Sequence, residues 1–490
     1  MTQTLKTLAT DVLICGAGAA GLTLAIDLAR RGVDFRLIDK AERPFQGSRG
    51  KGIQPRSLEV FEDLGVLDGM LALGAPYPLV RTYSGTGFVD STIGEGAEPN
   101  PAEPYATPLM LPQFLTEGVL RERLAALGHA PRYGAELTAL SQDADGVDAV
   151  LATGETIRAR WLVGADGGRS FVRHALAIDF PGKTLAIRAI VADVTLTGLS
   201  RDAWHQFGEV VERKLSFCPL AGTDLFQIQG VAPDGLETLS ADVLNALVRE
   251  RTGRADIVVH ELMWGSVYGM NARLADRYRV GRVLLAGDAA HVHPPTGGQG
   301  LNTSLQDGYN LGWKLAAVLA GAPDALIDTY EAERRPIAAG VLGLSTDLLK
   351  AARDGGGMNR GHEARQLDLG YPDSPLSLSL GETPTLAAGD RAPDAPCRGR
   401  SGASVRVFEV LAGPHWTLLC GPDAPGLAPR QGLRLARIGA DLIDDAGHFR
   451  DAYALAPDQM ILVRPDGYVA AVAGPGEVAA VEAYLAGVGV

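Results

Sequence analysis

The chain has 490 residues, enough for two or three domains, and its 46% hydrophobic and 21% charged residues are typical of a globular protein. Its formal net charge of −13 argues against nucleic acid or an anionic membrane surface as a partner. The four cysteines are scattered without a Cys-x-x-Cys pair, which argues against a disulfide framework and a structural zinc site. No cleavable signal precedes Asp11 and no apolar run reaches the length of a membrane span, so we expect a cytoplasmic protein.

Residues 11–32 have the pattern of a dinucleotide-binding strand, turn and helix. An apolar run over residues 12–15 leads into GAGAAG, which has the G-x-G-x-x-G spacing, and helical periodicity follows. In this pattern one glycine makes the tight turn, one lets a pyrophosphate approach the backbone, and one lets helix and strand pack closely. A second strand ends at Asp39, whose carboxylate can accept hydrogen bonds from ribose hydroxyls. The pattern predicts that this segment binds a dinucleotide.

A basic loop follows, and it has two interpretations. Arg49, Lys51 and Arg56 belong either to a solvated charged loop or to a set of cations that face the phosphates of the dinucleotide. Residues 74–108 are rich in Pro, Gly and Tyr and predict short strands and turns. A helix is expected over LPQFLTEGVLRERLAALG, with Thr116 as its N-cap.

Residues 180–265 have a different pattern, in which runs such as AIRAIVADVTL and IVVHELMW predict a separate antiparallel sheet. Period-two alternation would turn some of its side chains toward the dinucleotide and form an aromatic-lined pocket, while the others would be ordinary sheet core and surface. The sequence leaves open which side chains do so among Trp204, His205, Phe217, Phe226, Gln227, Trp264 and Tyr268.

The dinucleotide-type pattern returns at Arg282 with a strand, a Gly-Asp pair, a Pro/Gly loop and a long amphipathic helix. The start of that helix, near Leu301, would offer unpaired N–H groups that stabilise an anion. His291 and His293 precede the loop, and a proton-relay or structural role is favoured over a metal pair because no cluster of Cys or carboxylate residues completes a ligand set. We therefore expect no metal site.

The C-terminal third predicts a helix, a linker and a third unit. Residues 322–350 have helical periodicity, and residues 353–388 contain many glycines and prolines, which are typical of a linker. Strands are predicted over residues 416–420, 460–463 and 468–472, and a closing helix over residues 477–485.

Three of these motifs together resemble the group A flavoprotein monooxygenases, which have the fold of para-hydroxybenzoate hydroxylase. They are GAGAAG with Asp39, GADGGRSFVR, and LLAGDAAHVHPPTGGQGLNTSLQDGYNLGWKLA. The segments QLDLGYPDSPL and GDRAPDAP…LVRPDGYVA are similar to the three-domain subgroup, which includes aromatic polyketide hydroxylases and phenol-type hydroxylases. Because the tail lacks Cys-x-x-Cys, we expect a structural or association role there rather than redox chemistry.

The resemblance implies an α/β fold. A Rossmann-like FAD-binding domain of the glutathione-reductase type would be interrupted by an antiparallel substrate-binding sheet and followed by a thioredoxin-like domain. The expected boundaries are 1–178 and 277–385 for the FAD-binding domain with its helical linker, 179–276 for the substrate-binding domain, and 386–490 for the thioredoxin-like domain.

The resemblance also implies which residues bind FAD. The first glycine loop would hold the pyrophosphate, Asp39 the adenosine ribose, and Asp288 the ribitol, and Asp166 would serve the flavin side and nicotinamide access. Many relatives carry Glu at the position of Asp39. The shorter Asp side chain has a shorter reach to the ribose. The backbone of Pro295 and Gly298 would form the catalytic environment of the reacting oxygen. The full expected set is Gly16, Gly18, Ala19, Ala20, Gly21, Asp39, Lys40, Arg49, Gln113, Asp166, Asp288, Pro295, Gly298, Gly300, Leu301 and Asn302.

The expected activity is NAD(P)H- and O2-dependent hydroxylation of a small-molecule substrate that is phenolic or polycyclic aromatic and polyketide-like. NADPH or NADH would reduce FAD transiently, O2 would add to give a C4a-hydroperoxide, and its distal oxygen would pass to the ring. Baeyer–Villiger oxygen insertion and a flavin reductase or dehydrogenase of the same fold remain alternatives. A non-catalytic flavin-binding protein is disfavoured because all three fingerprints are intact. Both a monomer and a homodimer are compatible with the sequence.

Overall fold

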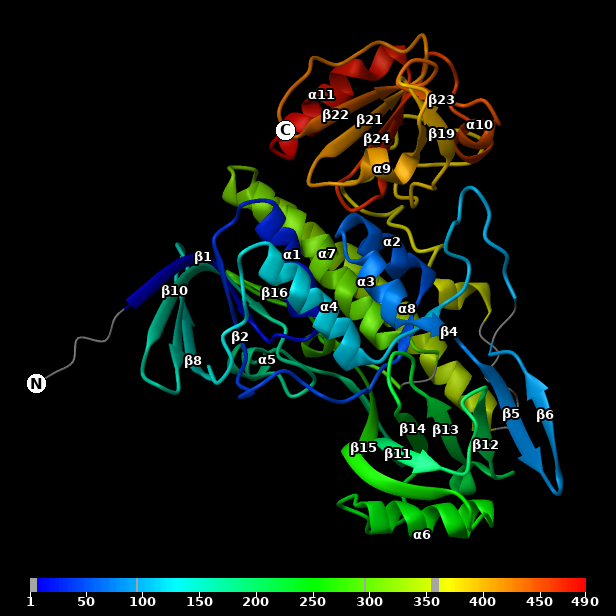
Figure 1. Cartoon of the computed structure of the whole chain (residues 1–490). Coiled ribbons are helices and arrows are strands. Elements are labelled where there is room, and N and C mark those ends of the chain that lie inside the picture. Colours follow the sequence, from blue (N-terminus) through cyan, green and yellow to red (C-terminus); the bar gives the residue numbers. More distant parts are fainter. Residues whose placement is uncertain (1–6, 94–95, 295–296, 354–360) are drawn as a thin grey trace, which may run out of the picture.

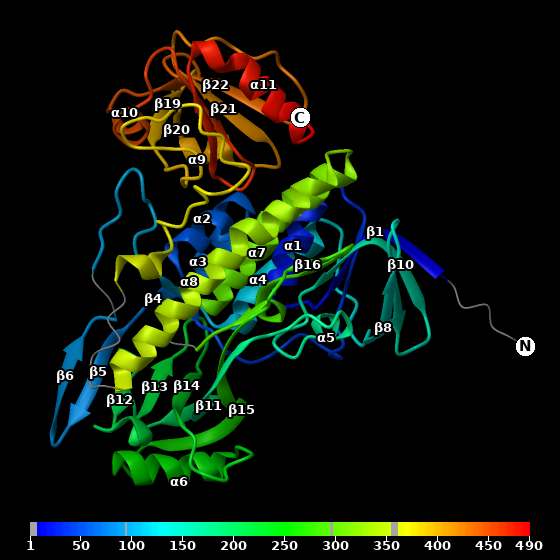
Figure 2. The ribbon, with the colours of Figure 1, turned by 180° about the vertical axis from the view of Figure 1, so that it is seen from behind.

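The computed structural model describes residues 7–93, 96–294, 297–353 and 361–490. Figure 1 shows a C-terminal unit at the top, a central unit of helices and a sheet, and a second large sheet at the bottom with one helix beneath it. Seen from behind, the long helix α8 (Asp328–Arg353) crosses the central unit (Figure 2). None of the described helices combines the length and the apolar character that a bilayer span requires.

The sheet of the central unit has parallel strands at its middle. β1 (Thr7–Cys15) lies between β2 (Phe35–Ile38) and β10 (Thr156–Gly164), and β17 (Val283–Leu285) pairs with the other edge of β10. Residues 12–14 are fully buried, as expected for a strand covered on both faces. Because β10 and β17 are neighbours in space but far apart in sequence, most of the chain between them forms a separate unit. Antiparallel strands complete the sheet: β8 (Leu137–Gln142), β9 (Val147–Leu151) and β16 (Arg279–Val280).

Two helices of the central unit, α1 (Ala19–Arg30) and α7 (Gly300–Leu319), pack closely side by side. A Cβ atom at Gly308 would lie 2.6 Å from the backbone oxygen of Ala20, and one at Gly312 would lie 2.3 Å from the Asp27 carboxylate. Both positions therefore require glycine, since a side chain would force the helices apart. The remaining elements of this unit are α2 (Pro55–Asp63), α3 (Leu67–Leu73), α4 (Gln113–Ala126), α5 (Phe171–Ala175), β3 (Gly52–Ile53), β4 (Ala75–Pro76) and β7 (Leu109–Met110).

The N-cap predicted for α4 is wrong. The helix begins at Gln113, so Thr116 lies within its first turn, where its hydroxyl donates to the backbone oxygen of Pro112 at 3.2 Å. A proline at the N-cap position fixes the entry of the chain, and the helix does not need a side-chain cap from Thr116.

The lower unit is an eight-stranded, mostly antiparallel sheet in the order β18-β15-β11-β14-β13-β12-β5-β6. Helix α6 (Ala241–Thr252) covers its outer face (Figure 1). The strands are β5 (Leu79–Ser84), β6 (Gly87–Ser91), β11 (Gly182–Thr197), β12 (Ala203–Phe207), β13 (Leu215–Pro219), β14 (Phe226–Val231), β15 (Val258–Leu274) and β18 (His291–Val292).

Three strands of this sheet come from outside the predicted segment 179–276. β5 and β6 lie before it and β18 lies after it. β5 joins through parallel pairing with β12, in which Leu79 is opposite Ala203. Such a pairing depends on contact between distant segments, and the periodicity within either segment does not encode it.

The C-terminal unit contains the predicted strands β21 (Trp416–Cys420) and β24 (Met460–Val463). β21 pairs parallel with β22 (Leu433–Arg437) and antiparallel with β24, which pairs antiparallel with β25 (Val469–Ala473). The closing helix is α11 (Val478–Gly487). The unit also contains β19 (Pro396–Gly399), β20 (Ser404–Arg406), β23 (Leu442–Ile443), α9 (Val407–Leu411) and α10 (His448–Tyr453).

A buried ionic network joins the C-terminal unit to α7 and α8. The Arg464 guanidinium contacts both carboxylate oxygens of Glu333 at 2.6 and 2.9 Å, and Lys314 Nζ lies 2.6 Å from Glu333 Oε2. Asp466 accepts hydrogen bonds from Trp313 Nε1 at 3.0 Å and from Arg464. The four charged side chains are at most 1% exposed, so each charge depends on its partners rather than on water.

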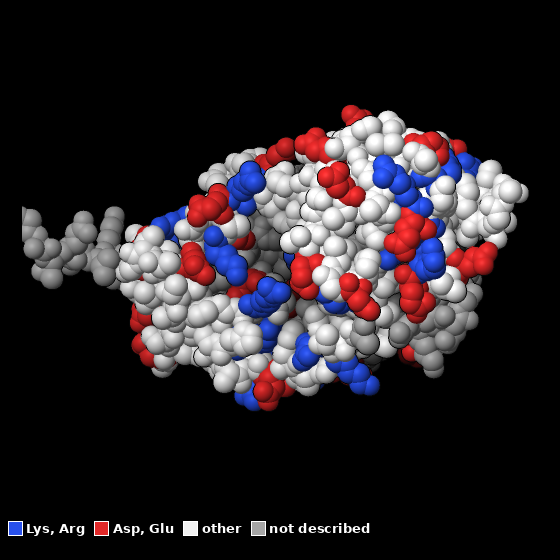
Figure 3. Space-filling model, turned by 90° about the horizontal axis from the view of Figure 1, so that it is seen from below, with Lys and Arg blue, Asp and Glu red and all other residues white. Residues whose placement is uncertain are grey.

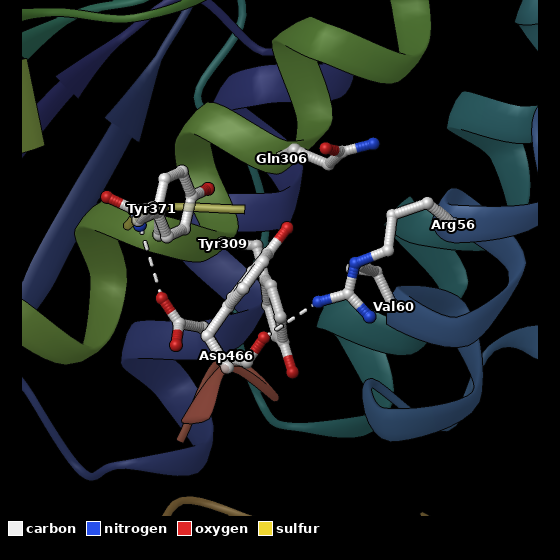
Figure 4. A pocket seen from close by; sticks show the side chains of 8 residues that line it. Arg56, Val60, Gln306, Tyr309, Tyr371 and Asp466 are labelled. Carbon is white, nitrogen blue, oxygen red and sulfur yellow. Dashed lines mark hydrogen bonds between the residues drawn. The ribbon is translucent and has the colours of Figure 1, made fainter. Parts of the chain in front are cut away.

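Figure 4 shows a small cavity beside this network, between α2, α7 and the turn that carries Asp466. Arg56 Nη2 donates to the backbone oxygen of Asp466 at 2.8 Å across it. The cavity measures about 10 Å³, far below the roughly 300 Å³ of a small-molecule site. The junction is therefore a packing interface and not a binding pocket.

We expect Arg464→Met to lower the free energy of unfolding by about 3 to 5 kcal/mol, because Asp466 loses its cation and Glu333 loses one of its two cations, Arg464, and keeps Lys314. Chemical unfolding followed by circular dichroism measures the change. Arg398→Met is the matched control. Arg398 also pairs with an aspartate, Asp445, but their side chains are 45% and 59% exposed, so we expect a change below about 1 kcal/mol. Equal losses in both variants would contradict the special role of the buried network.

Candidate cofactor and substrate site

The first glycine loop packs tightly against the end of β10. Gly16 has φ +113°, and a Cβ atom there would lie 2.2 Å from the backbone oxygen of Ala165. A Cβ atom at Gly21 would lie 2.0 Å from the backbone oxygen of Gly16. These two glycines are therefore required for the turn and for the close packing of the helix on the strand.

The loop presents the N-terminus of α1 to the site. Gly18, the N-cap residue, has no side chain that could cap the helix, and the Ala19 N–H group faces the Glu117 carboxyl of α4. The first backbone N–H groups of α1 lie at this loop, where an anion is expected. Asp39 is held beside the loop, since its two carboxylate oxygens accept hydrogen bonds at 2.8 Å from the backbone N–H groups of Ala17 and Ala41. Lys40 follows it and is exposed.

The Gly287–Asp288 turn, η2 (Gly287–Ala289), forms the second part of the site. Its anchor is Asp307 on α7, which accepts hydrogen bonds from the Gly287 backbone N–H at 3.0 Å, His291 Nε2 at 2.7 Å and Arg334 Nε at 2.8 Å. His291 and Arg334 hold the pKa of this buried carboxyl below its usual value, even though burial opposes them. The Asp288 side chain is left exposed at the site.

The sequence did not single out Asp307. The available signal was that Asp307 is the one acidic residue of the amphipathic stretch LNTSLQDGYNLGWKLA, because a carboxylate is rarely buried unless it is paired. The two histidines before the loop, His291 and His293, have different surroundings. His291 is bound to Asp307, whereas burial, with the charge of His291, lowers the pKa of His293 to about 4 and keeps that ring neutral.

The start of α7 is braced against the loop after β2. Asn302 accepts a hydrogen bond from the Gln54 backbone N–H at 2.8 Å and donates to the backbone oxygens of Gly52 and Gly298, both at 2.8 Å. Gly298, with φ +66°, makes the turn before the helix, and Gly300 is its first residue. Pro295, the remaining predicted residue of this loop, lies outside the described residues.

The structure brings the two glycine loops to one place. A Cβ atom at Gly287 would lie 3.0 Å from the Cβ of Ala20, and one at Gly50 would lie 3.6 Å from the Cβ of Leu301. Arg49 lies between the parts, because its charge acts on Asp288 while its backbone N–H donates to Gln113 Oε1 at 3.3 Å. Both ends of a single elongated ligand can therefore be held.

Asp166 lies next to the first glycine loop. A Cβ atom at Gly16 would come within 2.9 Å of the Asp166 backbone nitrogen, and Asp166 Oδ2 accepts a hydrogen bond from the Val172 backbone N–H at 3.1 Å. The other carboxylate oxygen is buried, and no described protein group bonds to it.

Acidic and basic side chains are interspersed on the face shown in Figure 3, which is hollowed near its middle. That face has no extended surface of one sign, as a polyanion-binding surface would have. In the described ranges, no three His, Cys, Asp or Glu side chains converge in a way that could hold a metal ion.

Residues 9–345 match the family described as FAD binding domain. The chain belongs to this FAD-binding family. It is 42% identical over 473 residues to a flavin-dependent monooxygenase of Mycobacteroides abscessus, covering 94% of this chain and 96% of the relative. It is 35% identical to a rifampicin monooxygenase of Rhodococcus hoagii, with 94% of each chain covered. A crystal structure of aklavinone-11 hydroxylase with FAD and aklavinone superposes with a TM-score of 0.79 at 28% identity over 99% of both chains.

These similarities confirm the resemblance to the group A flavoprotein monooxygenases. They agree with the convergence of the glycine loops, because FAD is long enough to need a site at each end.

Strand pairing decides which side of the sheet each candidate side chain occupies. Trp264, Asp193, Gln227 and Cys218 are directly opposite one another on successive strands and so lie on one face. Lys51 of the FAD-binding unit reaches this face, donating from Nζ to Gln227 Oε1 at 2.7 Å. This inner face therefore faces the FAD-binding unit.

Of the seven candidates, four lie on the inner face and three on the outer face. Lys51 Nζ lies 4.5 Å from the Trp204 ring centre. Tyr268 is opposite Ala189 and interacts electrostatically with Arg49. The outer face packs on α6 and carries Phe217 and Phe226, and His205 lies opposite Phe217. The inner candidates are Trp204, Gln227, Trp264 and Tyr268.

Asp193 is a fully buried carboxyl group on the inner face. Burial raises its pKa to about 6, although hydrogen bonds from Gln227 and Ser48 and the charge of Lys51 act in the opposite direction. A carboxyl whose pKa is higher in the folded than in the unfolded state adds to the free energy of unfolding below about pH 4. This stabilisation is lost as the pH rises through 6. The ionised form at pH 8 is therefore a cost to stability.

We expect Asp193→Asn to stabilise the protein at pH 8 by no more than about 3 kcal/mol and to leave its stability unchanged at pH 4, because the amide keeps the shape and removes the charge. Thermal unfolding at both pH values measures the difference. Asp234→Asn, which changes an exposed carboxylate beyond the same sheet, is the control and should show no such pH dependence. A stabilisation of equal size at pH 4 and pH 8 would contradict the assignment.

Proposed function

We propose that the protein is an NAD(P)H- and O2-dependent flavin monooxygenase that hydroxylates a phenolic or polycyclic aromatic compound. The observation that carries the proposal is the meeting of residues 16–21, 49–52, 287–288 and 298–302 at one site, with the inner face of the antiparallel sheet opposite them. When bound there, FAD supplies the redox chemistry, taking a hydride from NAD(P)H and passing electrons to O2.

The residues divide the binding of FAD between the two ends of the site. The N-terminus of α1, with Gly16, Gly18, Ala19, Ala20 and Gly21, holds the pyrophosphate, and Asp39 with Lys40 binds the adenosine ribose. Arg49 and Gln113 bind the central portion, and Asp288 binds the ribitol. The N–H groups of Leu301 and Asn302 stabilise negative charge on the flavin, while Gly298, Gly300 and Pro295 leave its ring face open to oxygen and substrate. Asp166 serves the flavin side.

The substrate is proposed to be a large aromatic compound lying against Trp204, Trp264 and Tyr268. Burial raises the pKa of Tyr268 to about 12, so its hydroxyl stays protonated and can donate a hydrogen bond to a substrate oxygen. The relatives that act on rifampicin and aklavinone support this substrate class. Aromatic walls also exclude water, which limits the wasteful release of peroxide.

The C-terminal unit is proposed to be a thioredoxin-like domain, covering residues 386–490, without redox function. Its mixed sheet of β22, β21, β24 and β25 packed by α11 supports the fold. Its two cysteines are not poised for redox chemistry, since burial raises the pKa of Cys397 to about 11 and also raises that of Cys420. Its role is to support α7 and α8 through Arg464 and Asp466.

We expect Asp288→Ala to weaken FAD binding about tenfold to a hundredfold, because a charge-assisted hydrogen bond to the ribitol is lost. Titration of the flavin-depleted protein with FAD, followed by flavin fluorescence, measures the affinity. Asp347→Ala removes an exposed carboxylate on α8 and should bind FAD normally. An Asp288→Ala protein that binds FAD as tightly as the parent would overturn the role of this carboxylate.

The activity is tested by screening phenols and polycyclic aromatics for stimulated NADPH and NADH oxidation, followed by mass spectrometry under ¹⁸O₂. The expected result is a product carrying one labelled oxygen on an aromatic carbon. Labelled oxygen inserted beside a ketone would indicate Baeyer–Villiger chemistry instead. Cofactor oxidation in air that never yields an oxygenated product from any compound would indicate a reductase and overturn the proposal.

A further inference from the structure

A buried carboxyl group lies next to the first glycine loop, on a helix that the sequence assigned to the cofactor only through Gln113. Glu117 is four residues after Gln113 on α4, which packs against α1, and it is 1% exposed. Its Oε1 atom would lie 3.8 Å from a Cβ atom at Gly18, the N-cap residue of α1. The carboxyl therefore lies against the loop that is proposed to bind the pyrophosphate.

Glu117 also sets the orientation of Gln113. The amide nitrogen of Gln113 donates to Glu117 Oε1 at 2.8 Å, and its amide oxygen accepts from the Arg49 backbone N–H at 3.3 Å. Both ends of the Gln113 amide are thus occupied, and the side chain can have only one of its two flipped orientations. Glu117 is therefore connected through the Gln113 amide to the backbone of Arg49.

The charged groups around Glu117 do not neutralise it. Arg121 Nη1 is 3.9 Å from Glu117 Oε2, beyond a good hydrogen bond, and the Ala19 N–H group faces the carboxyl from α1. Asp39 opposes them from the end of β2, and Tyr133 lies beside Arg121 and Asp39. Burial is the largest effect and raises the pKa of Glu117 to about 7, so the group exchanges its proton near physiological pH.

We propose that Glu117 takes up a proton from solvent when FAD binds and so makes cofactor affinity depend on pH. The pyrophosphate brings two negative charges to the N–H groups of α1, and an ionised carboxylate next to them would be repelled. Uptake of one proton removes this repulsion and gives Glu117 an O–H group that can donate. The reaction is balanced by one proton from the buffer for each FAD bound, with no change in covalent bonding. This inference rests on the proposed FAD site.

The coupling between proton uptake and FAD binding determines how the dissociation constant of FAD changes with pH. Below about pH 7 the carboxyl is protonated with or without FAD, and it contributes no pH dependence. Above pH 7 the free protein is ionised and must be protonated on binding, so the dissociation constant of FAD rises up to about tenfold per pH unit. Glu117→Gln presents a neutral group of the same shape that can still accept from Gln113, and its affinity should stay level across this range.

The experiment is isothermal titration of the flavin-depleted full chain with FAD between pH 6 and 9, in pairs of buffers that differ in ionisation enthalpy. The parent is expected to take up nearly one proton per FAD at pH 8, and Glu117→Gln close to none. Glu122→Gln, which changes an exposed carboxylate on the same helix, is the control and should behave like the parent. Parent protein that binds FAD at pH 8 without proton uptake would overturn the inference, and this result needs no variant.

The failure of this inference and the failure of the proposed function are distinct. A chain that takes up no FAD at any pH would overturn the cofactor assignment itself. FAD binding with equal proton uptake in the parent and in Glu117→Gln would retain the cofactor and remove only Glu117 from its binding.

Discussion

The cofactor site depends on the close contact between α1 and α7. Gly308 and Gly312 let the two helices approach until the backbone at Ala20 and the Asp27 side chain fill the space that a Cβ atom would occupy. Because the helices are adjacent over this length, the glycine loop before α1 and the loop before α7 open onto the same region. Two segments nearly three hundred residues apart in sequence, residues 16–21 and 298–302, are thereby brought to the proposed FAD site.

Buried charges fix this contact in place. Asp307 ties the Gly287–Asp288 turn to α7 and, through Arg334, to α8. About two turns further along α7, Lys314 binds Glu333 of α8, which extends the network to Arg464 of the C-terminal unit. Each of these charges is expensive to leave unpaired in a low-dielectric interior, so the helices, the turn and the C-terminal unit are constrained together. The C-terminal unit is thus tied to the helices that carry the proposed cofactor site.

The two faces of the antiparallel sheet have different roles, one in the hydrophobic core and one toward the FAD-binding unit. The outer face is apolar and packs on α6, whereas the inner face carries aromatic and polar side chains and meets Lys51 from the FAD-binding unit. Alternation along each strand makes this division, and pairing between strands aligns residues of one kind into rows across the sheet. A single sheet can therefore be a core element and a wall of a binding site.

The sequence by itself determined those features that are local requirements of the backbone. The G-x-G-x-x-G turn, the Gly-Asp turn and the strands of residues 416–420 and 460–463 follow from glycine geometry and short apolar runs, which need no distant partner. Only the tertiary structure decided which side chains face the cofactor, that β5 and β6 join the second sheet, and that Asp307 and Glu117 lie at the site. These depend on pairing and burial between distant segments, and a residue's own neighbours in sequence carry no record of them.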